Sequence, residues 1–303
     1  MQQAETRIEN HPCIQHVGDL YNWKRVLDML PPRGSITPYS KIPSEVDAVL
    51  SRIKTRYGMK AYHTFNRWLL VKAMSQTADS AVLREMPARL FAEWETWCHR
   101  VLSDLDQASE ASFSFQNDFF LKDLAVCRLK MIPAVSNVLE MLGLARRVMF
   151  RGNVKQFIRM SLLVWTGNVK PYFQTHMDLR YLNDFNPSGR TQCFLAASEF
   201  LSRTPEVKGL FSSSWYNDPA LDDISPHLSY LRRIPLENGA VLFRVGSSEQ
   251  DVNNATMKSK TRKRLYEAGQ YVPTCYMWVW PRARLMRWAS AQNPSQESIA
   301  LHA

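Results

Sequence analysis

A histidine and an aspartate stand two residues apart where a predicted strand ends. His176 and Asp178 close the segment that begins at Val169, and alternate residues of a strand share one face. An aspartate that accepts a hydrogen bond from one imidazole nitrogen leaves the other nitrogen free to take a proton. We therefore predict His176 as a general base oriented by Asp178, with Tyr172 and Arg180 of the same segment contacting the substrate.

The same pair allows two other interpretations. A His-x-Asp pair supplies two of the three ligands in the facial triad of non-haem iron oxygenases, and His227 is the candidate third ligand. Those enzymes are built on a double-stranded β-helix, whereas a helix is predicted between His176 and His227, so a metal is not expected here. Without a metal, His227 is predicted as a further substrate contact. The structural interpretation is a strand-end histidine that its neighbouring aspartate hydrogen-bonds.

A second polar group follows the strand predicted at 207–213. Its sequence, from Ser212 to Pro219, is SSSWYNDP. Small hydroxyl residues and aromatic residues at a strand end are typical of a pocket rim. We predict Trp215 and Tyr216 as substrate contacts and Asp218 as a catalytic residue at the acceptor pocket. The alternative is a loop with an Asx turn and a core tryptophan. No Gly-x-Ser-x-Gly pattern surrounds these serines, which disfavours a hydrolase nucleophile.

A third group joins a predicted strand, 240–245, to the start of a helix. Small residues there expose backbone N–H groups that can hold a phosphate at the positive end of the helix dipole. The predicted cofactor contacts are Arg244, Gly246, Ser247 and Ser248. No Gly-Lys-Ser/Thr sequence ends this loop, so it is not a Walker A motif. The alternative is an ordinary helix cap.

The stretch from Arg264 to Tyr271, RLYEAGQY, precedes the last predicted strand. It resembles the C-terminal signature of the GNAT acyltransferases, in which a Leu-Tyr-Glu helix precedes a glycine, an aromatic residue and a final strand. The resemblance covers about ten residues and implies coenzyme A as the donor. The sequence departs from the family pattern because a single helix predicted from 248 to 268 leaves no space for the family's additional strand.

Basic residues accompany tryptophans near the C-terminus. Arg282, Arg284 and Arg287 lie close to three tryptophans, at 278, 280 and 288. Such a surface could stack and pair with single-stranded nucleic acid, which makes a nucleic-acid-binding or regulatory protein the alternative function. Alternation of aromatic residues on one strand is equally typical of a buried sheet face.

The net charge of +10 is concentrated in two stretches. Residues 128–190 hold ten Lys or Arg against three acids, and residues 258–287 hold eight against one. Each stretch therefore contributes +7, and the rest of the chain sums to −4. Clustered positive charge favours an anionic partner: a phosphate-bearing cofactor or other anionic small molecule, nucleic acid, or an acidic lipid surface.

Hydrophobic periodicity predicts the elements that position these groups. Apolar residues recur at helical spacing through the first third, and strands then alternate with helices. We predict a mixed α+β fold in which a helical region precedes a layered α/β domain of about four or five strands. The predicted parts are a frayed N-terminus (1–19), a helical region (20–106), a Ser-rich linker (107–117), a basic α/β domain (118–291) and a flexible tail (292–303).

The remaining composition favours a cytoplasmic protein. The five cysteines are widely spread, which argues against a disulfide framework or a zinc knuckle. No apolar run approaches the roughly 20 residues that span a bilayer, and the N-terminus lacks a secretory signal. Together these features predict a group-transfer enzyme that uses a phosphate-bearing donor such as a coenzyme A thioester and a His-Asp base. The sequence does not specify the substrate, the strand order or the oligomeric state.

Overall fold

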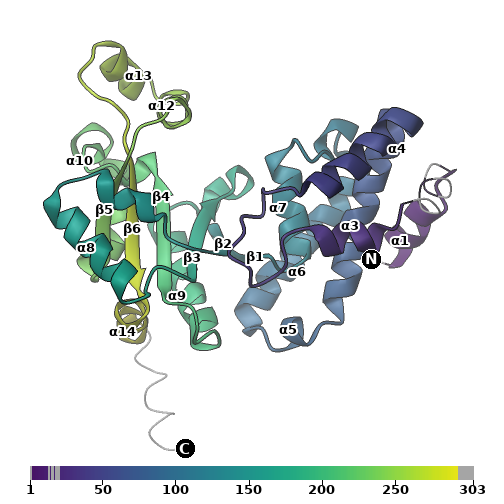
Figure 1. Ribbon diagram of the computed structural model, residues 1–303, viewed down its shortest axis with the longest axis horizontal. Helices are drawn as coiled ribbons and strands as arrows, with labels where there is room; N and C mark the ends of the chain where they lie inside the picture. Colours follow the sequence, from purple (N-terminus) through teal and green to yellow (C-terminus); the bar gives the residue numbers. More distant parts are fainter. Residues whose placement is uncertain (1, 13, 15–16, 18–20, 293–303) are drawn as a thin grey trace, which may run out of the picture. The chain divides into compact units, whose positions relative to one another are not determined.

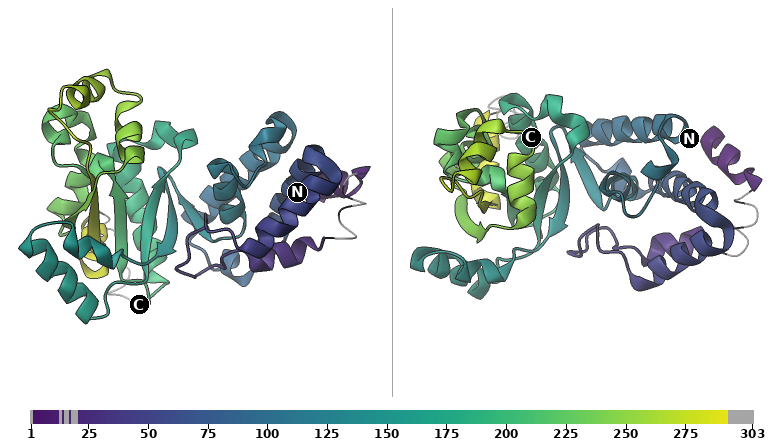
Figure 2. Two further views of the ribbon diagram at one scale, coloured as in Figure 1. Left: turned by 45° about the horizontal axis from the view of Figure 1, so that its top comes forward. Right: turned by 90° about the horizontal axis from the view of Figure 1, so that it is seen from above.

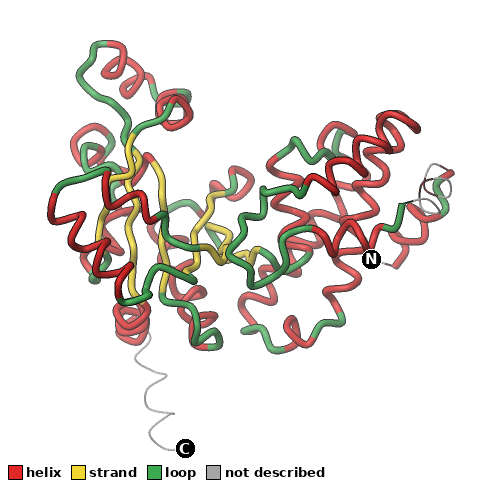
Figure 3. Tube along the Cα trace, in the orientation of Figure 1, coloured by secondary structure: helices red, strands yellow, loops and turns green. Residues whose placement is uncertain are grey.

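The computed structural model describes residues 2–12, 14, 17 and 21–292. It divides into two compact units. The first comprises Met1–Ala134 with Val138–Met141, and the second comprises Val135–Asn137 with Leu142–Ala303. The predicted mixed α+β fold with a helical N-terminal region is confirmed, and helices and strands are distinguished by colour in Figure 3.

The first unit is built mainly from helices. Its longest element, α4 (Ser44–Ala78), is interrupted at Gly58, where φ is +83° and ψ is 175°. Glycine adopts positive φ without steric cost, so the helix can kink at this residue. The other elements are α1 (Gln2–Glu9), α3 (Trp23–Met29), α5 (Ala81–Arg84), α6 (Ala88–Gln107), η1 (Glu110–Ser112), α7 (Asp118–Cys127) and β1 (Met131–Ala134).

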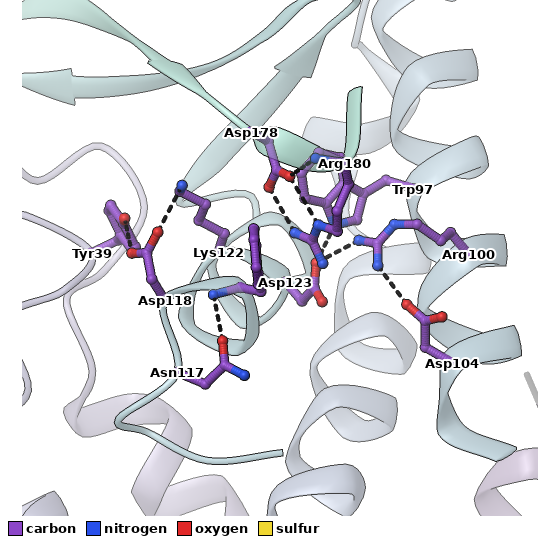
Figure 4. A network of polar contacts seen from close by, with 11 residues as sticks. Tyr39, Trp97, Arg100, Asp104, Asn117, Asp118, Lys122, Asp123, Asp178 and Arg180 are labelled. Atoms are coloured by element: carbon purple, nitrogen blue, oxygen red, sulfur yellow. Dashed lines mark hydrogen bonds and ion pairs between the residues drawn. The ribbon is translucent and has the colours of Figure 1, made fainter. Parts of the chain in front are cut away.

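Polar contacts fasten α6 to α7 within this unit (Figure 4). The Asp123 carboxylate accepts a hydrogen bond from Trp97 Nε1 at 2.9 Å and pairs with Arg100, whose guanidinium also donates to Asp104 at 2.7 Å. At the start of α7, Asp118 accepts from the Tyr39 hydroxyl at 2.6 Å. These interactions satisfy charges that helix packing partly buries.

Two parts of the chain differ from the sequence-based boundaries. Residues 2–9 of the predicted frayed N-terminus form α1, where Glu5 and Glu9 pair with Lys72 of α4. The predicted linker at 107–117 lies within the first unit: Phe113 and Phe115 are buried, and Asn66 donates to the Phe113 carbonyl at 2.9 Å. The units divide instead at residues 134–142, because aromatic side chains anchor the Ser-rich stretch.

The predicted tail, 292–303, lies outside the described residues except for Gln292, the last residue of α14 (Arg282–Gln292).

Six strands form a mixed sheet, slightly more than predicted, in the order β1-β2-β3-β4-β6-β5 (Figure 1). In the second unit β3 and β4 are parallel, whereas β6 is antiparallel to both β4 and β5. Besides β1, the strands are β2 (Asn137–Leu142), β3 (Tyr172–Met177), β4 (Gly209–Ser214), β5 (Val241–Gly246) and β6 (Cys275–Pro281).

Helices cover both faces of this sheet. On one face Met160 of α8 (Val154–Trp165) packs in a core with Tyr172, Phe211 and Phe243. On the other, the Phe194 ring of α9 (Pro187–Ser202) meets three tryptophan rings, at 278, 280 and 288, with centroid distances of 5.9, 5.3 and 6.1 Å. The remaining elements are η2 (Arg146–Phe150), η3 (Leu179–Asp184), η4 (Trp215–Asn217), α10 (Leu221–Ile224), η5 (Pro226–Leu228) and α11 (Tyr230–Glu237).

The single helix predicted from 248 to 268 is wrong. The structure has two short helices there, α12 (Glu249–Thr256) and α13 (Lys260–Glu267), which lie beyond the ends of β5 and β6 (Figure 2). The Ser259 hydroxyl accepts from the Arg262 N–H at 3.3 Å and caps a new helix. A serine N-cap satisfies an N–H group that a continuous helix would have bonded internally.

Candidate functional site

Strand direction brings the three predicted polar groups to one edge of the sheet. β3 and β4 run in the same direction, and β5 shares it because both β4 and β5 are antiparallel to β6. His176, Ser214 and Gly246 therefore stand at the carboxyl ends of three co-directional strands. The register also places Ser214 of β4 and Arg244 of β5 opposite the same residue of β6, Tyr276. Ligands of open α/β sheets bind at such carboxyl edges.

The two parallel strands are paired over a short length. The register joins Phe173 with Leu210 and Gln174 with Phe211. On its other side β4 pairs with β6 as far as Ser214.

His176 and Asp178 end and follow β3, as predicted. Asp178 is buried, and its carboxylate is engaged with Arg180 (Figure 4). Oδ1 accepts from the Arg180 backbone N–H and from Nε, both at 2.9 Å, and Oδ2 accepts from Nη2 at 2.7 Å. The bond from the Arg180 backbone N–H makes Asp178 the N-cap of η3. The two bonds from the guanidinium hold the Arg180 side chain against the same carboxylate. Orientation of His176 by Asp178 stays a prediction.

The segment after β4 forms a compact aromatic turn. Ser212 is buried, and its hydroxyl lies 3.3 Å from the Tyr216 hydroxyl. The Trp215 ring is covered by the Arg262 guanidinium, whose carbon lies 4.8 Å from the ring centroid. Arg262 also donates to Ser225 Oγ at 2.9 Å. These contacts fasten α13 to the turn, and substrate contact by Trp215 and Tyr216 stays a prediction.

Asp218 is buried at the base of the same turn. Its Oδ1 accepts from the Ala220 N–H at 3.0 Å and its Oδ2 from the Thr274 N–H at 3.1 Å. Burial raises the pKa of the Asp218 carboxyl, although these two bonds, Tyr271 and Arg232 act to lower it. The carboxylate thus ties the β4 turn to the segment that enters β6. A catalytic role for Asp218 stays a prediction.

The structure does not bring together two other residues predicted to contact substrate, Tyr172 and His227. Tyr172 is 1% exposed and belongs to the core beneath α8, with its hydroxyl donating to the Asn168 carbonyl at 3.2 Å. His227 is an exposed residue of η5. Within the part of the chain that the structure describes, no three His, Cys, Asp or Glu side chains group as metal ligands would. The iron triad of His176, Asp178 and His227 is therefore not assembled.

The loop between β5 and α12 is held by its own contacts. Ser247 Oγ donates to the Pro273 carbonyl at 2.7 Å. Ser248 caps α12 by accepting from the Asp251 N–H at 3.2 Å, and it donates to the Asp251 carboxylate at 2.6 Å. Glu249 and Asp251 place two acids in the first helical turn, where negative charge opposes a phosphate. Cofactor contact by Arg244, Gly246, Ser247 and Ser248 stays a prediction.

The three tryptophans of the predicted nucleic-acid surface are buried. Trp278, Trp280 and Trp288 are 0%, 0% and 8% exposed. Each of them packs against Phe194 of α9, and Trp280 also packs against Trp288. Buried indole rings cannot stack on bases, so the interpretation as a buried sheet face is the correct one.

The sequence analysis missed Arg190, the fourth residue of α9. Its guanidinium is fully buried, lies over the Phe194 ring at 4.7 Å and donates through Nη1 to Asn137 Oδ1. Nε and Nη2, which form one fork of the guanidinium, have no hydrogen-bond partner, and neither has Asn137 Nδ2. No described carboxylate pairs with Arg190. A charged residue within the apolar face of the predicted helix was the available signal, since buried cations are normally paired.

Comparisons with known proteins give little support for any assignment. No protein-family model matches the chain, and no curated protein matches it. An acyltransferase solved with decanoyl-CoA and teicoplanin aligns with 92% of this chain and 98% of its own, at a TM-score of 0.46 and 11% identity. An acyltransferase solved with CoA and 10C-teicoplanin covers the same shares at a TM-score of 0.39 and 12% identity. Scores below 0.5 do not establish a common fold.

Proposed function

We propose that the second unit is an acyltransferase that moves an acyl group from a coenzyme A thioester to an amine or hydroxyl acceptor. The observation that supports this most is that the carboxyl ends of β3, β4 and β5 lie at one edge of the sheet. Ligands of open α/β sheets bind at such edges, and the donor arm is proposed to lie there. His176 on β3 and the Ser212–Tyr216 turn after β4 then flank the arm.

Exposed cations of α13 and of the turn that precedes it are the proposed contacts for the donor phosphates. Lys258, Lys260, Lys263 and Arg264 are exposed, and Lys263 alone among them has a described acidic partner, Glu267 at 3.9 Å. That pair is exposed on both sides and contributes little. α13 lies beyond the edge at which β3, β4 and β5 end, so its positive charge stands on the side where the donor arm would emerge.

In the proposed reaction His176 acts as the general base. It takes a proton from the acceptor N–H or O–H while that nitrogen or oxygen attacks the thioester carbonyl carbon. The C–N or C–O bond forms, the C–S bond breaks as the tetrahedral intermediate collapses, and the thiolate of the donor takes up a proton. The reaction therefore balances without an oxidant or a reductant.

We further propose that Arg190 binds an anionic group of the acceptor. Nε and Nη2 of a guanidinium donate in parallel to a carboxylate, and the adjacent Asn137 Nδ2 adds a third donor. A buried site made of donors alone favours an anion, because a buried cation without a partner is costly.

The test measures donor binding by calorimetry with the full chain. Coenzyme A should bind, and Lys260→Ala with Lys263→Ala should weaken it roughly tenfold at low salt, with a smaller difference at high salt. Lys208→Ala is the matched control, because this exposed lysine precedes β4 at the opposite end of the sheet. Acetyl-CoA with a panel of amines should then release free thiol. Absence of coenzyme A binding, or equal loss in the control, would overturn the proposal, and tight binding of a single-stranded oligonucleotide instead would favour the nucleic-acid alternative.

A further inference from the structure

The second unit carries an exposed row of large apolar side chains on α8 and η2. Phe150 is 73% exposed, Val154 73%, Ile158 51%, Leu162 53% and Trp165 88%. Phe157, 43% exposed, has its ring centroid 5.8 Å from that of Phe150. We call these six residues the apolar stripe.

Helical spacing places the apolar stripe on one side of α8. Val154, Ile158, Leu162 and Trp165 follow one another at intervals of four, four and three residues, which keeps them on one face. The buried residues of the helix, among them Gln156 and Met160, face the sheet. The apolar stripe is therefore additional to the core contact. Monomeric proteins rarely expose so many large apolar side chains together, and such patches mark interaction surfaces.

The surroundings of the apolar stripe are positively charged. Five basic residues lie in η2, α8 and the turn between them, and the whole segment from 141 to 177 contains no Asp or Glu. All five are exposed: Arg146, Arg147, Arg151, Lys155 and Arg159. A helix with an apolar face that includes tryptophan, flanked by cations, is the composition of helices that lie in a membrane interface.

We propose that α8 and η2 bind an anionic lipid surface, with the helix lying in the plane of the membrane. The 12 residues of α8 are too few to span a bilayer, which takes about 20. Among the described residues no helix has the length and apolar character to cross a membrane. Apolar side chains enter the boundary between headgroups and acyl chains, and the cations pair with anionic headgroups.

Charge distinguishes this occupant from a second copy of the chain. A two-fold symmetric contact places a patch on itself. The five cations would then face the same five cations, with no acid of the segment to offset them. An anionic surface with an apolar interior matches both the charge and the stripe. The inference does not depend on the proposed acyl transfer, because it concerns the sheet face that is opposite to α9.

The experiment is co-sedimentation of the full chain with phosphatidylcholine vesicles, with and without phosphatidylserine. The protein should bind the vesicles that contain phosphatidylserine. Phe157→Ser with Trp165→Ser should weaken binding at least about tenfold, and Lys155→Ala with Arg159→Ala should do the same in a salt-sensitive manner. The matched controls are Val272→Ser, which changes an apolar residue 55% exposed elsewhere, and Arg287→Ala.

Three results would overturn the inference: no binding to either vesicle, binding that the stripe and cation variants leave unchanged, or a dimer that the stripe variants dissociate while vesicles are ignored. Light scattering of the same samples measures the dimer. Because all four substituted side chains are exposed, melting temperatures should stay near that of the wild type and identify any variant that misfolds.

Discussion

Gln156 and Arg244 hydrogen-bond reciprocally. The Gln156 Oε1 accepts from the Arg244 N–H at 2.7 Å, and its Nε2 donates to the Arg244 carbonyl at 2.8 Å. The buried Gln156 amide thereby bonds to the backbone N–H and carbonyl of the edge strand β5 as a neighbouring strand would. The same Nε2 donates to the Val148 carbonyl at 2.7 Å. One side chain thus joins α8, η2 and β5, and it holds the helix that carries the apolar stripe.

Gln156→Leu should destabilise the second unit. The substitution keeps the side-chain volume but leaves the Arg244 N–H and the Val148 carbonyl without their partner, at a cost of about 1–3 kcal/mol. Urea denaturation should show a lower midpoint for the variant. Lys155→Ala, a change at the adjacent exposed position, should leave the midpoint near the wild-type value. Equal midpoints for Gln156→Leu and wild type would show that water replaces the amide without loss.

His176→Ala should separate catalysis from folding. If His176 is the general base, the acyl-transfer rate should fall by about 10²- to 10⁴-fold, with coenzyme A affinity and melting temperature nearly unchanged. A comparison with Asp178→Asn reports on the neighbouring carboxylate. Loss of rate without loss of stability would assign Asp178 to orienting His176. Loss of stability alone would assign it to holding Arg180 and η3.

Arg190→Met should be at least as stable as wild type and should lose activity. Methionine has a similar length and carries no charge, and replacing a buried unpaired cation removes its desolvation cost. The proposed anion contact would be lost, which should raise the KM for a carboxylate-bearing acceptor and leave coenzyme A binding intact. The measurements are a melting curve and steady-state kinetics. A variant that melts far below wild type would instead make Arg190 a structural residue held by Asn137 and Phe194.

The stability contributed by Asp218 should decrease as pH rises. Burial raises its pKa in the folded protein, so the folded state binds this proton more tightly than the unfolded chain, whose pKa is about 3.9. The contribution is complete below the unfolded pKa and is lost as pH rises through the folded pKa. The stability of wild type relative to Asp218→Asn should therefore decline from pH 4 upward, by at most about 1.4 kcal/mol per pH unit. An increase of this stability difference with rising pH would contradict the prediction.

Local sequence signals predicted many elements of the second unit closely. The strands predicted at 207–213 and 240–245 correspond to β4 (Gly209–Ser214) and β5 (Val241–Gly246), and α9 begins at Pro187, where a missing N–H costs nothing. Signals for element ends are short-range: a capping side chain, a proline, a glycine with positive φ. The same kind of signal was missed at Ser259, where a serine cap divides one predicted helix into α12 and α13.

The sequence did not predict how these elements pack against one another. Periodicity states which residues share a face, but it does not state what covers that face. Trp278 and Trp280 alternate as a surface strand could, and only the position of Phe194 on α9 buries them. Val154 and Ile158 have the spacing of core residues, yet they are exposed because α8 meets the sheet through its other side.

The sequence by itself determined the fold class, the basic stretches and the two polar groups at His176 and Ser212. Only the tertiary structure decided that these groups lie at the same edge of the sheet. Parallel pairing of Phe173 with Leu210 sends β3 and β4 to the same edge, and an antiparallel pair would have placed their ends at opposite edges. Hydrogen-bond pairing between strands depends on contacts between residues 37 positions apart in the chain. No local signal encodes that choice, because each strand has the same pattern of side chains in either direction.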